Sequence, residues 1–238
     1  MIQCNEVNYQ HGDTVCQGYL AYDDQASAIR PVVMIAPDWR GRGEAACEKA
    51  RQLASMGYVG FAMDMYGEAR VGLDNEQRRA LMTPLVQNRE HLAERLLAAY
   101  NTVCHLPQVD ARRIAAIGYC FGGLCVLDLA RTGVALRGVV SFHGLLSEPA
   151  GSHADIQAKV LVLHGYDDPL VPPEQVRQFA DEMTRKQVDW QVHMYGLTAH
   201  SFSNPEAHEK ETGLVYNAAA DHRSWQTTAL FLDEIFKD

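Results

Sequence analysis

The hydrophobic residues of this chain gather in short runs that alternate with segments of helical spacing. Residues 32–36 and 159–163 are almost continuously apolar, the pattern of strands buried on both faces of a parallel sheet. Residues 58–63 and 138–142 form similar runs. At the start of the chain, residues 2–9 and 14–22 flank the turn His11-Gly12-Asp13, which predicts an antiparallel ribbon.

The segments between these runs predict helices and two further strands. Helical spacing covers residues 44–56, 74–87, 88–105, 174–186 and 217–236, and further strands are expected at 114–117 and, as the last strand, at 189–195. Strands that alternate with helices in this way are typical of an α/β protein. We therefore expect one domain over residues 1–238, with a mostly parallel central sheet flanked by helices on both faces.

Composition narrows the possible partners. The net charge of −9 argues against a nucleic-acid or anionic membrane surface. No stretch has the length of a membrane span, and the first residues do not resemble a signal peptide. The six cysteines are scattered without metal-type pairing, so we expect reduced thiols and a cytoplasmic location.

One glycine-rich segment, residues 117–123, stands between a strand-like run and an apolar helical run. Its Gly-x-Cys-x-Gly spacing, from Gly118 to Gly122, is that of a nucleophile elbow, with Cys120 where most such enzymes carry serine. In an elbow the nucleophile projects from the top of the sheet, and the next backbone N–H, that of Phe121, faces a developing oxyanion. The alternative is a buried cysteine in a tight turn, because free cysteine is often buried.

The residues that follow the predicted strands test these alternatives. Ligands of open α/β sheets bind at the carboxyl ends of strands. Asp38 and Trp39 follow the first core strand, Cys120 follows the elbow strand, Asp168 follows the strand at 159–163, and His200 follows the last strand. The order nucleophile, acid, base is that of α/β-hydrolases, which favours the enzyme and predicts the α/β-hydrolase fold.

Each of the three residues has a chemical role in this hypothesis. A free thiol has a pKa near ~8.5, so a neighbouring imidazole is needed to keep it reactive at neutral pH. His200 would share the proton of Cys120 and later donate it to the leaving group, and Asp168 would fix the tautomer of His200. Asp167 is the competing acid, one residue nearer the strand.

The chain also resembles a known family, the dienelactone hydrolases. The resemblance extends over most of the chain and is carried by Gly118-Tyr119-Cys120-Phe121-Gly122-Gly123, by His164-Gly165-x-x-Asp168-Pro169-x-Val171-Pro172, by Ala199-His200-Ser201-Phe202 and by the tail 215–225. It implies a cysteine hydrolase that cuts carboxylic esters or lactones through an acyl-enzyme. By position, Cys120, Asp168 and His200 take the places of the triad, and this resemblance favours Asp168 over Asp167.

The resemblance implies two further roles near the first core strand. The family carries a glutamate there that keeps the resting thiol protonated, and this chain has Asp38, which is one methylene shorter. Trp39 matches the position of the second oxyanion N–H, alongside that of Phe121.

The pocket departs from the family pattern. The family grips a substrate carboxylate with arginines, one of them four residues after the catalytic histidine, where this chain has Asn204. Arg78 or its neighbour Arg79 is a candidate for a second arginine. Tyr119 and His143, next to predicted strand ends, are further candidates for the pocket.

We therefore expect an α/β-hydrolase that cleaves small activated esters or lactones without a cofactor or metal. Its expected partner is the small-molecule substrate, with no nucleic acid and no membrane, and the oligomeric state is open. One alternative is attack on another activated electrophile, a thioester or a phosphotriester. The other is a hydrolase fold that binds a partner without catalysis.

Overall fold

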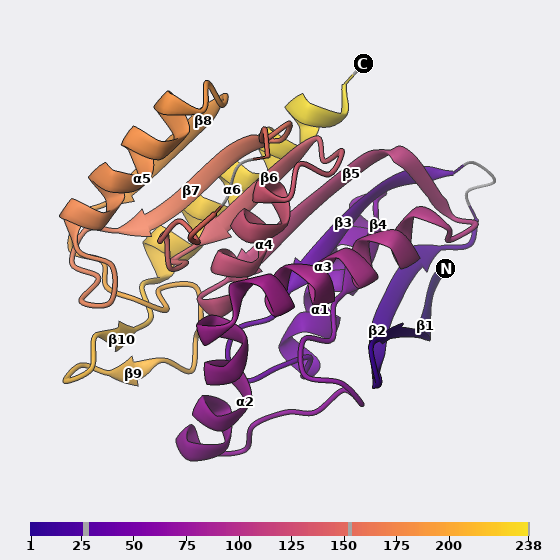
Figure 1. Ribbon diagram of the computed structural model, residues 1–238, viewed down its shortest axis with the longest axis horizontal. Helices are drawn as coiled ribbons and strands as arrows, with labels where there is room; N and C mark the ends of the chain where they lie inside the picture. Colours follow the sequence, from indigo (N-terminus) through magenta and orange to yellow (C-terminus); the bar gives the residue numbers. More distant parts are fainter. Residues whose placement is uncertain (26–28, 152–153, 238) are drawn as a thin grey trace. The chain divides into compact units, whose positions relative to one another are not determined.

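The computed structural model describes residues 1–25, 29–151 and 154–237 (Figure 1). The chain forms two compact units, Met1–Ile117 and Gly118–Asp238. The expectation of one domain over residues 1–238 stays a prediction. None of the described helices is both long enough and apolar enough to span a bilayer.

The first unit contains a twisted sheet whose strands run in the order β1-β2-β4-β3-β5. The strands are β1 (Ile2–His11), β2 (Thr14–Asp23), β3 (Arg30–Ala36), β4 (Val59–Ala62) and β5 (Val109–Tyr119), the last of which continues into the second unit. β1 and β2 pair antiparallel along their whole length, which confirms the predicted ribbon. β3 and β4 are parallel, and residues 32–36 of β3 are buried as their apolar run predicts.

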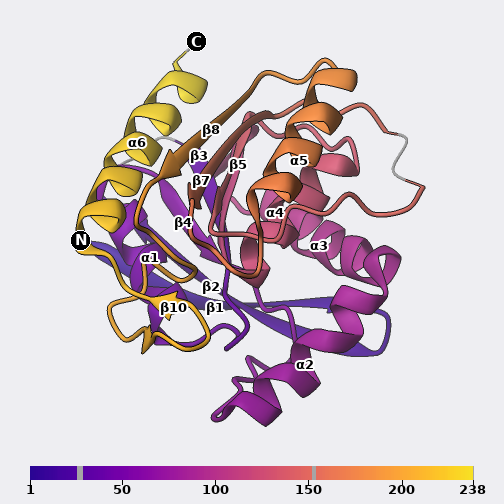
Figure 2. The same ribbon diagram turned by 90° about the vertical axis from the view of Figure 1, so that its left-hand side faces the viewer.

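The helices of the first unit are α1 (Glu44–Ser55), α2 (Asn75–Gln87) and α3 (Arg89–Cys104). The side chain of Asp74 accepts a hydrogen bond from the N–H of Gln77 and caps α2, and that of Asn88 caps α3. Such caps satisfy donors that the first turn of a helix leaves unpaired. α1 packs against β2, β3 and β4, α3 packs against β1, and the two helices lie on opposite sides of these strands (Figures 1 and 2).

The second unit has three consecutive parallel strands, β6, β7 and β8. Their bounds are Gly138–Phe142, Lys159–Gly165 and Trp190–Tyr195, and the helices are α4 (Phe121–Arg131), α5 (Pro173–Arg185) and α6 (Ala218–Phe236). α4 and α5 stand on one side of these strands and α6 on the other (Figures 1 and 2). β6 is buried throughout, as expected of a strand covered on both faces.

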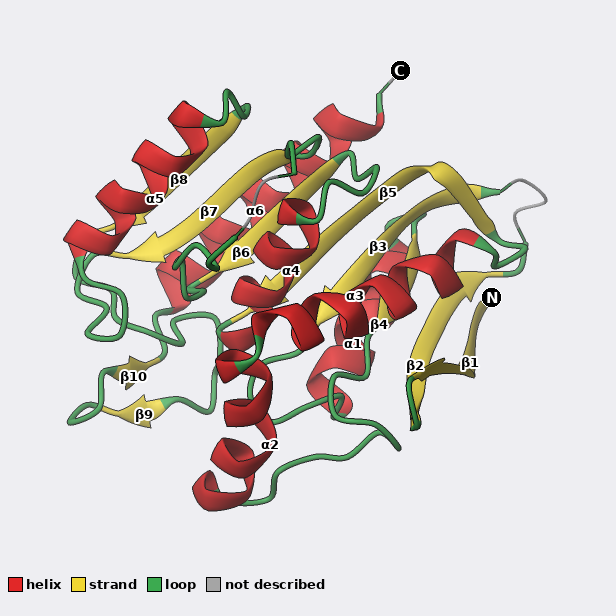
Figure 3. Cartoon of the chain, viewed as in Figure 1, coloured by secondary structure: helices red, strands yellow, loops and turns green. Residues whose placement is uncertain are grey.

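The segment after β8 corrects one expectation. The strand at 189–195 was expected to be the last, yet β9 (His208–Glu209) and β10 (Leu214–Val215) follow it and pair antiparallel (Figure 3). Each has only two residues, too few to produce a periodic hydrophobic pattern. The small hairpin matters because its second strand meets the backbone of His200, in a bridge to Leu214.

Candidate active site

Cys120 lies in the turn between β5 and α4. Its φ of 53° and ψ of −115° place a non-glycine residue in a sparsely populated region, at a cost of about 1–3 kcal/mol. Gly118 makes the turn possible, because a Cβ there would lie 1.9 Å from the carbonyl oxygen of Gly122. The backbone N–H of Cys120 donates to the carbonyl of Phe142 at 3.0 Å, so the end of β6 holds the turn in place.

His200 joins Cys120 to Asp168. Its Nε2 lies 3.1 Å from Cys120 Sγ, and its Nδ1 lies 2.7 Å from Asp168 Oδ2. His200 and Asp168 are buried, whereas Cys120 is partly exposed. Three residues that follow three different strands thus form one hydrogen-bonded row, and its least buried member is Cys120.

The charges in this row favour a protonated imidazole. Burial acts to lower the pKa of His200, but the negative sulfur of Cys120 and the hydrogen bond to Asp168 outweigh it and raise this pKa to about 10. A protonated His200 is therefore favoured at neutral pH, with one ring nitrogen directed at Cys120 Sγ and the other at Asp168 Oδ2.

The carboxylate in this row is that of Asp168, and not that of its exposed neighbour Asp167. The second carboxylate oxygen of Asp168 accepts hydrogen bonds from the N–H groups of Leu170 and Val171, at 2.8 and 3.3 Å. Asp167 is exposed, and its backbone N–H donates to the carbonyl of Thr198.

The two predicted oxyanion donors belong to different units. Phe121 is the first residue of α4 and is fully buried, so its N–H belongs to a helix N-terminus, where the helix dipole is positive. In the first unit, the carbonyl of Trp39 accepts a hydrogen bond from the hydroxyl of Tyr66, and the guanidinium of Arg78 lies over its indole, 5.7 Å from the ring centroid. The role of the Trp39 N–H stays a prediction.

Asp38 is engaged by Arg40 within the first unit. The guanidinium of Arg40 contacts both carboxylate oxygens of Asp38, with Nη2 2.8 Å from Oδ2, and the backbone N–H of Arg40 donates to Oδ1. A carboxylate with these partners is held in a fixed orientation. That Asp38 modulates the thiol stays a prediction.

The two residues considered for carboxylate recognition serve their own loops. Arg78 donates to the carbonyls of Gly72 and Leu73 and to Asn75 Oδ1. Asn204 donates its N–H to the carbonyl of Ser201, and its Oδ1 accepts from the N–H of Glu206. The guanidinium of Arg78 thus already donates to backbone carbonyls, and Asn204 has a neutral amide rather than a cation.

Tyr119 and His143 lie beside the row of three side chains. The ring of Tyr119 stacks on Phe142 with centroids 4.6 Å apart, and burial raises the pKa of its hydroxyl. The ring of His143 meets the edge of His200 at 5.1 Å. Tyr119 therefore packs on Phe142, whose carbonyl holds Cys120, and His143 packs on His200, all within the second unit.

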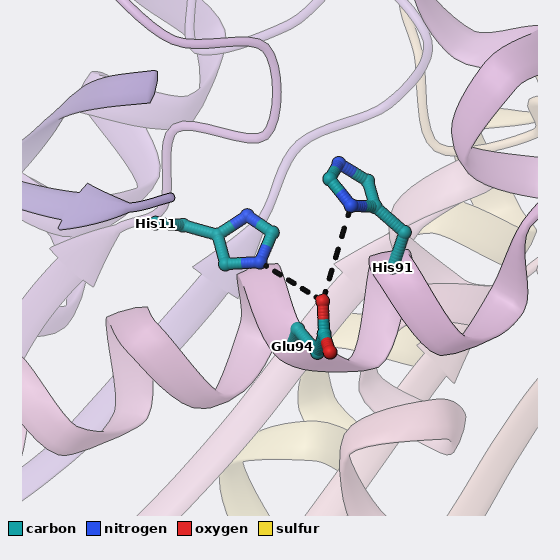
Figure 4. Close-up of side chains that lie close together, drawn as sticks. All are labelled: His11, His91 and Glu94. Atoms are coloured by element: carbon teal, nitrogen blue, oxygen red, sulfur yellow. Dashed lines mark hydrogen bonds and ion pairs between the residues drawn. The ribbon is translucent and has the colours of Figure 1, made fainter. Parts of the chain in front are cut away.

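A separate group of possible metal ligands lies in the first unit. Donor atoms of His11, His91 and Glu94 lie within 4.8 Å of one another (Figure 4), and no other such group occurs among the residues that the structure describes. This group was not predicted from the sequence. The i,i+3 spacing of His91 and Glu94 was visible, but His11 comes from 83 positions before Glu94.

The hydrogen bonds of this group do not fit a metal. Arg95 Nε–H donates to His11 Nδ1 at 2.8 Å, so the ring proton sits on Nε2 and points to Glu94 Oε2, 3.3 Å away. A metal on Nε2 would move that proton to Nδ1, against the N–H of Arg95. A histidine ligand normally donates its other N–H to an acceptor. The group is better explained as a contact that ties the end of β1 to α3.

Comparison with known proteins agrees with the family resemblance of the sequence motifs. A model of the dienelactone hydrolase family matches residues 16–236. The chain is 40% identical to a dienelactone hydrolase-like promiscuous phosphotriesterase from metagenomic libraries, whose crystal structure matches with a TM-score of 0.95 over 99% of each chain.

More distant proteins match as well. A probable 2-oxo-3-(5-oxofuran-2-ylidene)propanoate lactonase of a Bradyrhizobium species is 26% identical over 213 residues, which cover 85% of this chain and 83% of that protein. An α/β hydrolase from a deep-sea metagenome is 17% identical and matches with a TM-score of 0.67 over 98% of each chain. The predicted α/β-hydrolase fold is confirmed by these structural matches.

Proposed function

The chain belongs to the dienelactone hydrolase family, and from that premise we propose that it cleaves small activated carboxylic esters or lactones through Cys120, His200 and Asp168. The observation that carries the proposal is the position of His200, with its two ring nitrogens 3.1 Å from Cys120 Sγ and 2.7 Å from Asp168 Oδ2. A base that is hydrogen-bonded to both a nucleophile and an orienting acid is the arrangement that acyl transfer requires.

The first half of the reaction forms a thioester. The thiolate of Cys120 attacks the carbonyl carbon of the ester, and the electron pair of the C=O bond moves onto its oxygen. When this intermediate collapses, the bond to the alkoxide breaks and the alkoxide takes the proton from His200 Nε2. The N–H of Phe121, and by expectation that of Trp39, would stabilise the oxyanion.

The second half releases the acid. Neutral His200 takes a proton from a water molecule while the water oxygen attacks the thioester carbonyl carbon. The carbon–sulfur bond then breaks, which returns the thiolate of Cys120 and leaves His200 protonated. Asp168 supports this step because its oxygen holds the proton on Nδ1 and directs Nε2 toward the reacting atoms.

A second activity, hydrolysis of phosphotriesters, is favoured by one comparison. The relative that is 40% identical over nearly the whole chain is described as a promiscuous phosphotriesterase. In this reaction the thiolate of Cys120 attacks phosphorus and expels an aryloxide, and water must then cleave the sulfur–phosphorus bond. We propose it as a side activity of the same residues.

The expected location remains a proposal. All six cysteines are free thiols, which is the usual state in a reducing compartment. We propose that the protein acts in the cytoplasm.

Turnover of a neutral aryl ester such as 4-nitrophenyl butyrate tests the main proposal. We expect Cys120→Ala to lower kcat/KM by at least about 10³-fold, because loss of a nucleophile removes the covalent route. The matched control is Cys125→Ala, which removes a buried thiol from α4, the helix that follows Cys120, and should change kcat/KM only a few-fold.

Two outcomes would contradict the proposal. Equal turnover by the unmodified protein and C120A would mean that another group performs the chemistry. Absence of turnover of ester, lactone and phosphotriester by the unmodified, folded protein would favour a binding module that has kept the hydrolase fold.

A further inference from the structure

The end of β6 contacts both reacting partners of the proposed mechanism. The carbonyl of Phe142 accepts the backbone N–H of Cys120 at 3.0 Å. The next residue, His143, places its ring edge-on against His200, with centroids 5.1 Å apart and an interplanar angle of 64°. Two successive residues of one strand end therefore touch the nucleophile and the base.

His143 is held firmly in this position. It has a φ of 38°, which is rare for a residue with a side chain, and its N–H donates to the carbonyl of Leu163 at 2.9 Å. Its ring also meets Phe202 at 5.1 Å with an interplanar angle of 83°. Only 2% of the residue is exposed, so the surrounding packing determines the orientation of the ring.

One hydrogen bond joins His143 to the chain segment that follows His200. His143 Nε2 lies 2.8 Å from Ser203 Oγ. Among the residues described, its Nδ1 meets no hydrogen-bond partner beyond its own residue. A bare acceptor is easier to bury than an unpaired N–H, so the proton belongs on Nε2, which donates to Ser203.

The groups that face His143 make it a neutral residue. Burial, followed by the charge of His200, holds the pKa of His143 well below its usual range. The other titratable groups around it are His164 of β7, whose own pKa is lowered by burial, and Tyr119, whose ring lies 6.3 Å away. His143 therefore carries no charge at neutral pH, and the protonated form of the pair is His200.

A buried nitrogen without a hydrogen-bond partner costs about 1–3 kcal/mol. A purely apolar ring at position 143 would fill the same space without this cost, so packing alone does not explain a histidine here. The nitrogen that is paired, Nε2, bonds to Ser203, three residues after His200. We propose that His143 is a positioning residue, a neutral imidazole that fixes the ring plane of His200 through its edge contact and through the hydrogen bond to Ser203. This inference rests on the proposed function.

By fixing the ring plane of His200, His143 would align His200 Nε2 with the sulfur of Cys120. A charge-assisted hydrogen bond weakens as its angle departs from linearity. If His143 loses its contact with Ser203, the segment after His200 can shift, and the imidazolium stabilises the thiolate less. Because the thiolate is the form that reacts with an alkylating agent, a less stabilised thiolate is expected to move the pH dependence of alkylation upward.

The test measures the rate of alkylation of Cys120 by iodoacetamide between pH 5 and pH 10, with the modified residue identified by mass spectrometry. This readout needs no substrate. The variants are S203A, which removes the hydroxyl, H143F, which keeps a flat ring, and H143Q, whose amide can still donate to Ser203. The matched control is S224A, because Ser224 is a buried serine of α6 whose hydroxyl donates to the carbonyl of Asp221 in the same helix.

We expect S203A and H143F to raise the midpoint of the alkylation curve by about half a pH unit or more, a threefold change in the protonation equilibrium. At pH 6 the rate should fall about three- to tenfold, the range that one neutral hydrogen bond supports. H143Q should shift the midpoint less than H143F, and the double variant H143F/S203A should resemble H143F alone. S224A should lower the melting temperature without moving the midpoint.

Unchanged midpoints in S203A and H143F would overturn the inference and leave His143 a packing residue. Additive shifts in the double variant would also overturn it, because the two residues would then act separately. Failure of the proposed function has a different signature, in which Cys120 of the unmodified protein is not alkylated ahead of the other five cysteines.

Discussion

At the scale of single residues, Asp168 uses its two carboxylate oxygens for different purposes. Oδ1 accepts the N–H groups of Leu170 and Val171, and Oδ2 faces His200 Nδ1 at 2.7 Å. The first two bonds fix the plane of the carboxylate, so the third fixes the imidazole tautomer. An amide at this position could keep the geometry but not the preference for the correct tautomer.

We predict that Asp168→Asn lowers kcat for a neutral aryl ester by about 10⁴-fold, the scale observed when a triad acid loses its charge. Asp167→Asn is the matched control, because Asp167 is the adjacent residue and is exposed, and it should change kcat less than about threefold. Steady-state kinetics at pH 7.5 on both variants decide the matter. Equal losses, or a larger loss in Asp167→Asn, would contradict the assignment of the acid.

The sequence predicted Cys120, Asp168 and His200 because each follows a recognisable strand, and the structure brings their side chains together. The preference for Asp168 over its neighbour came from family resemblance, since spacing alone allowed either. The bond between His143 and Ser203 could not be predicted. It joins residues 60 positions apart, and only the packed structure determines which loop atoms meet.

At the scale of elements, the junction of β5 and α4 depends on the absence of a side chain at Gly118. A Cβ there would lie 1.9 Å from the carbonyl oxygen of Gly122 and 2.3 Å from its carbonyl carbon. Both are backbone atoms of a helix that is buried along its length, so neither can move aside. The strand and the helix can approach this closely only when residue 118 is glycine.

We predict that Gly118→Ala destabilises the protein by more than about 3 kcal/mol, as expected when a buried backbone clash cannot relax, and that any folded fraction has lost its esterase activity. Gly196→Ala is the control, because a Cβ at Gly196 would have no atom within 4 Å. Urea unfolding and ester turnover of both variants are the measurements. A folded and active G118A protein would show that the turn does not need the close approach.

The elements differ in how well the sequence predicted them. β6 has the expected bounds because a buried parallel strand is a continuous apolar run. β5 spans Val109–Tyr119 rather than 114–117, since the charged residues Asp110 and Arg112 in its first part interrupt the apolar run. β9 and β10 were missed, although the bridge from Leu214 to His200 makes this hairpin a support of the base.

At the scale of the whole molecule, charge bears on the choice of substrate. The chain carries a net charge of −9, and such a field repels anions at low ionic strength. Four positions after His200, where the family resemblance implies an arginine, Asn204 has a neutral amide, whose oxygen already accepts a hydrogen bond from the N–H of Glu206. Long-range repulsion and the amide in place of a guanidinium at position 204 both disfavour a carboxylated substrate, whereas a neutral ester is affected by neither.

We predict that kcat/KM is higher for a neutral aryl ester than for a carboxylated dienelactone. The measurement compares both substrates, and an aryl phosphotriester, in the same buffer. Raising the salt concentration from about 10 mM to about 150 mM should increase kcat/KM for the dienelactone only, because the Debye length falls from about 30 Å to about 8 Å and the repulsion is screened.

The variant Asn204→Arg should raise kcat/KM for the dienelactone about tenfold or more, since a guanidinium pairs bidentately with a carboxylate. It should leave kcat/KM for the neutral ester within a few-fold. Asn204→Ala controls for loss of the amide. A preference of the unmodified enzyme for the dienelactone of about tenfold or more, a difference of 1.4 kcal/mol, would mean that another cation already holds the carboxylate and would contradict this prediction.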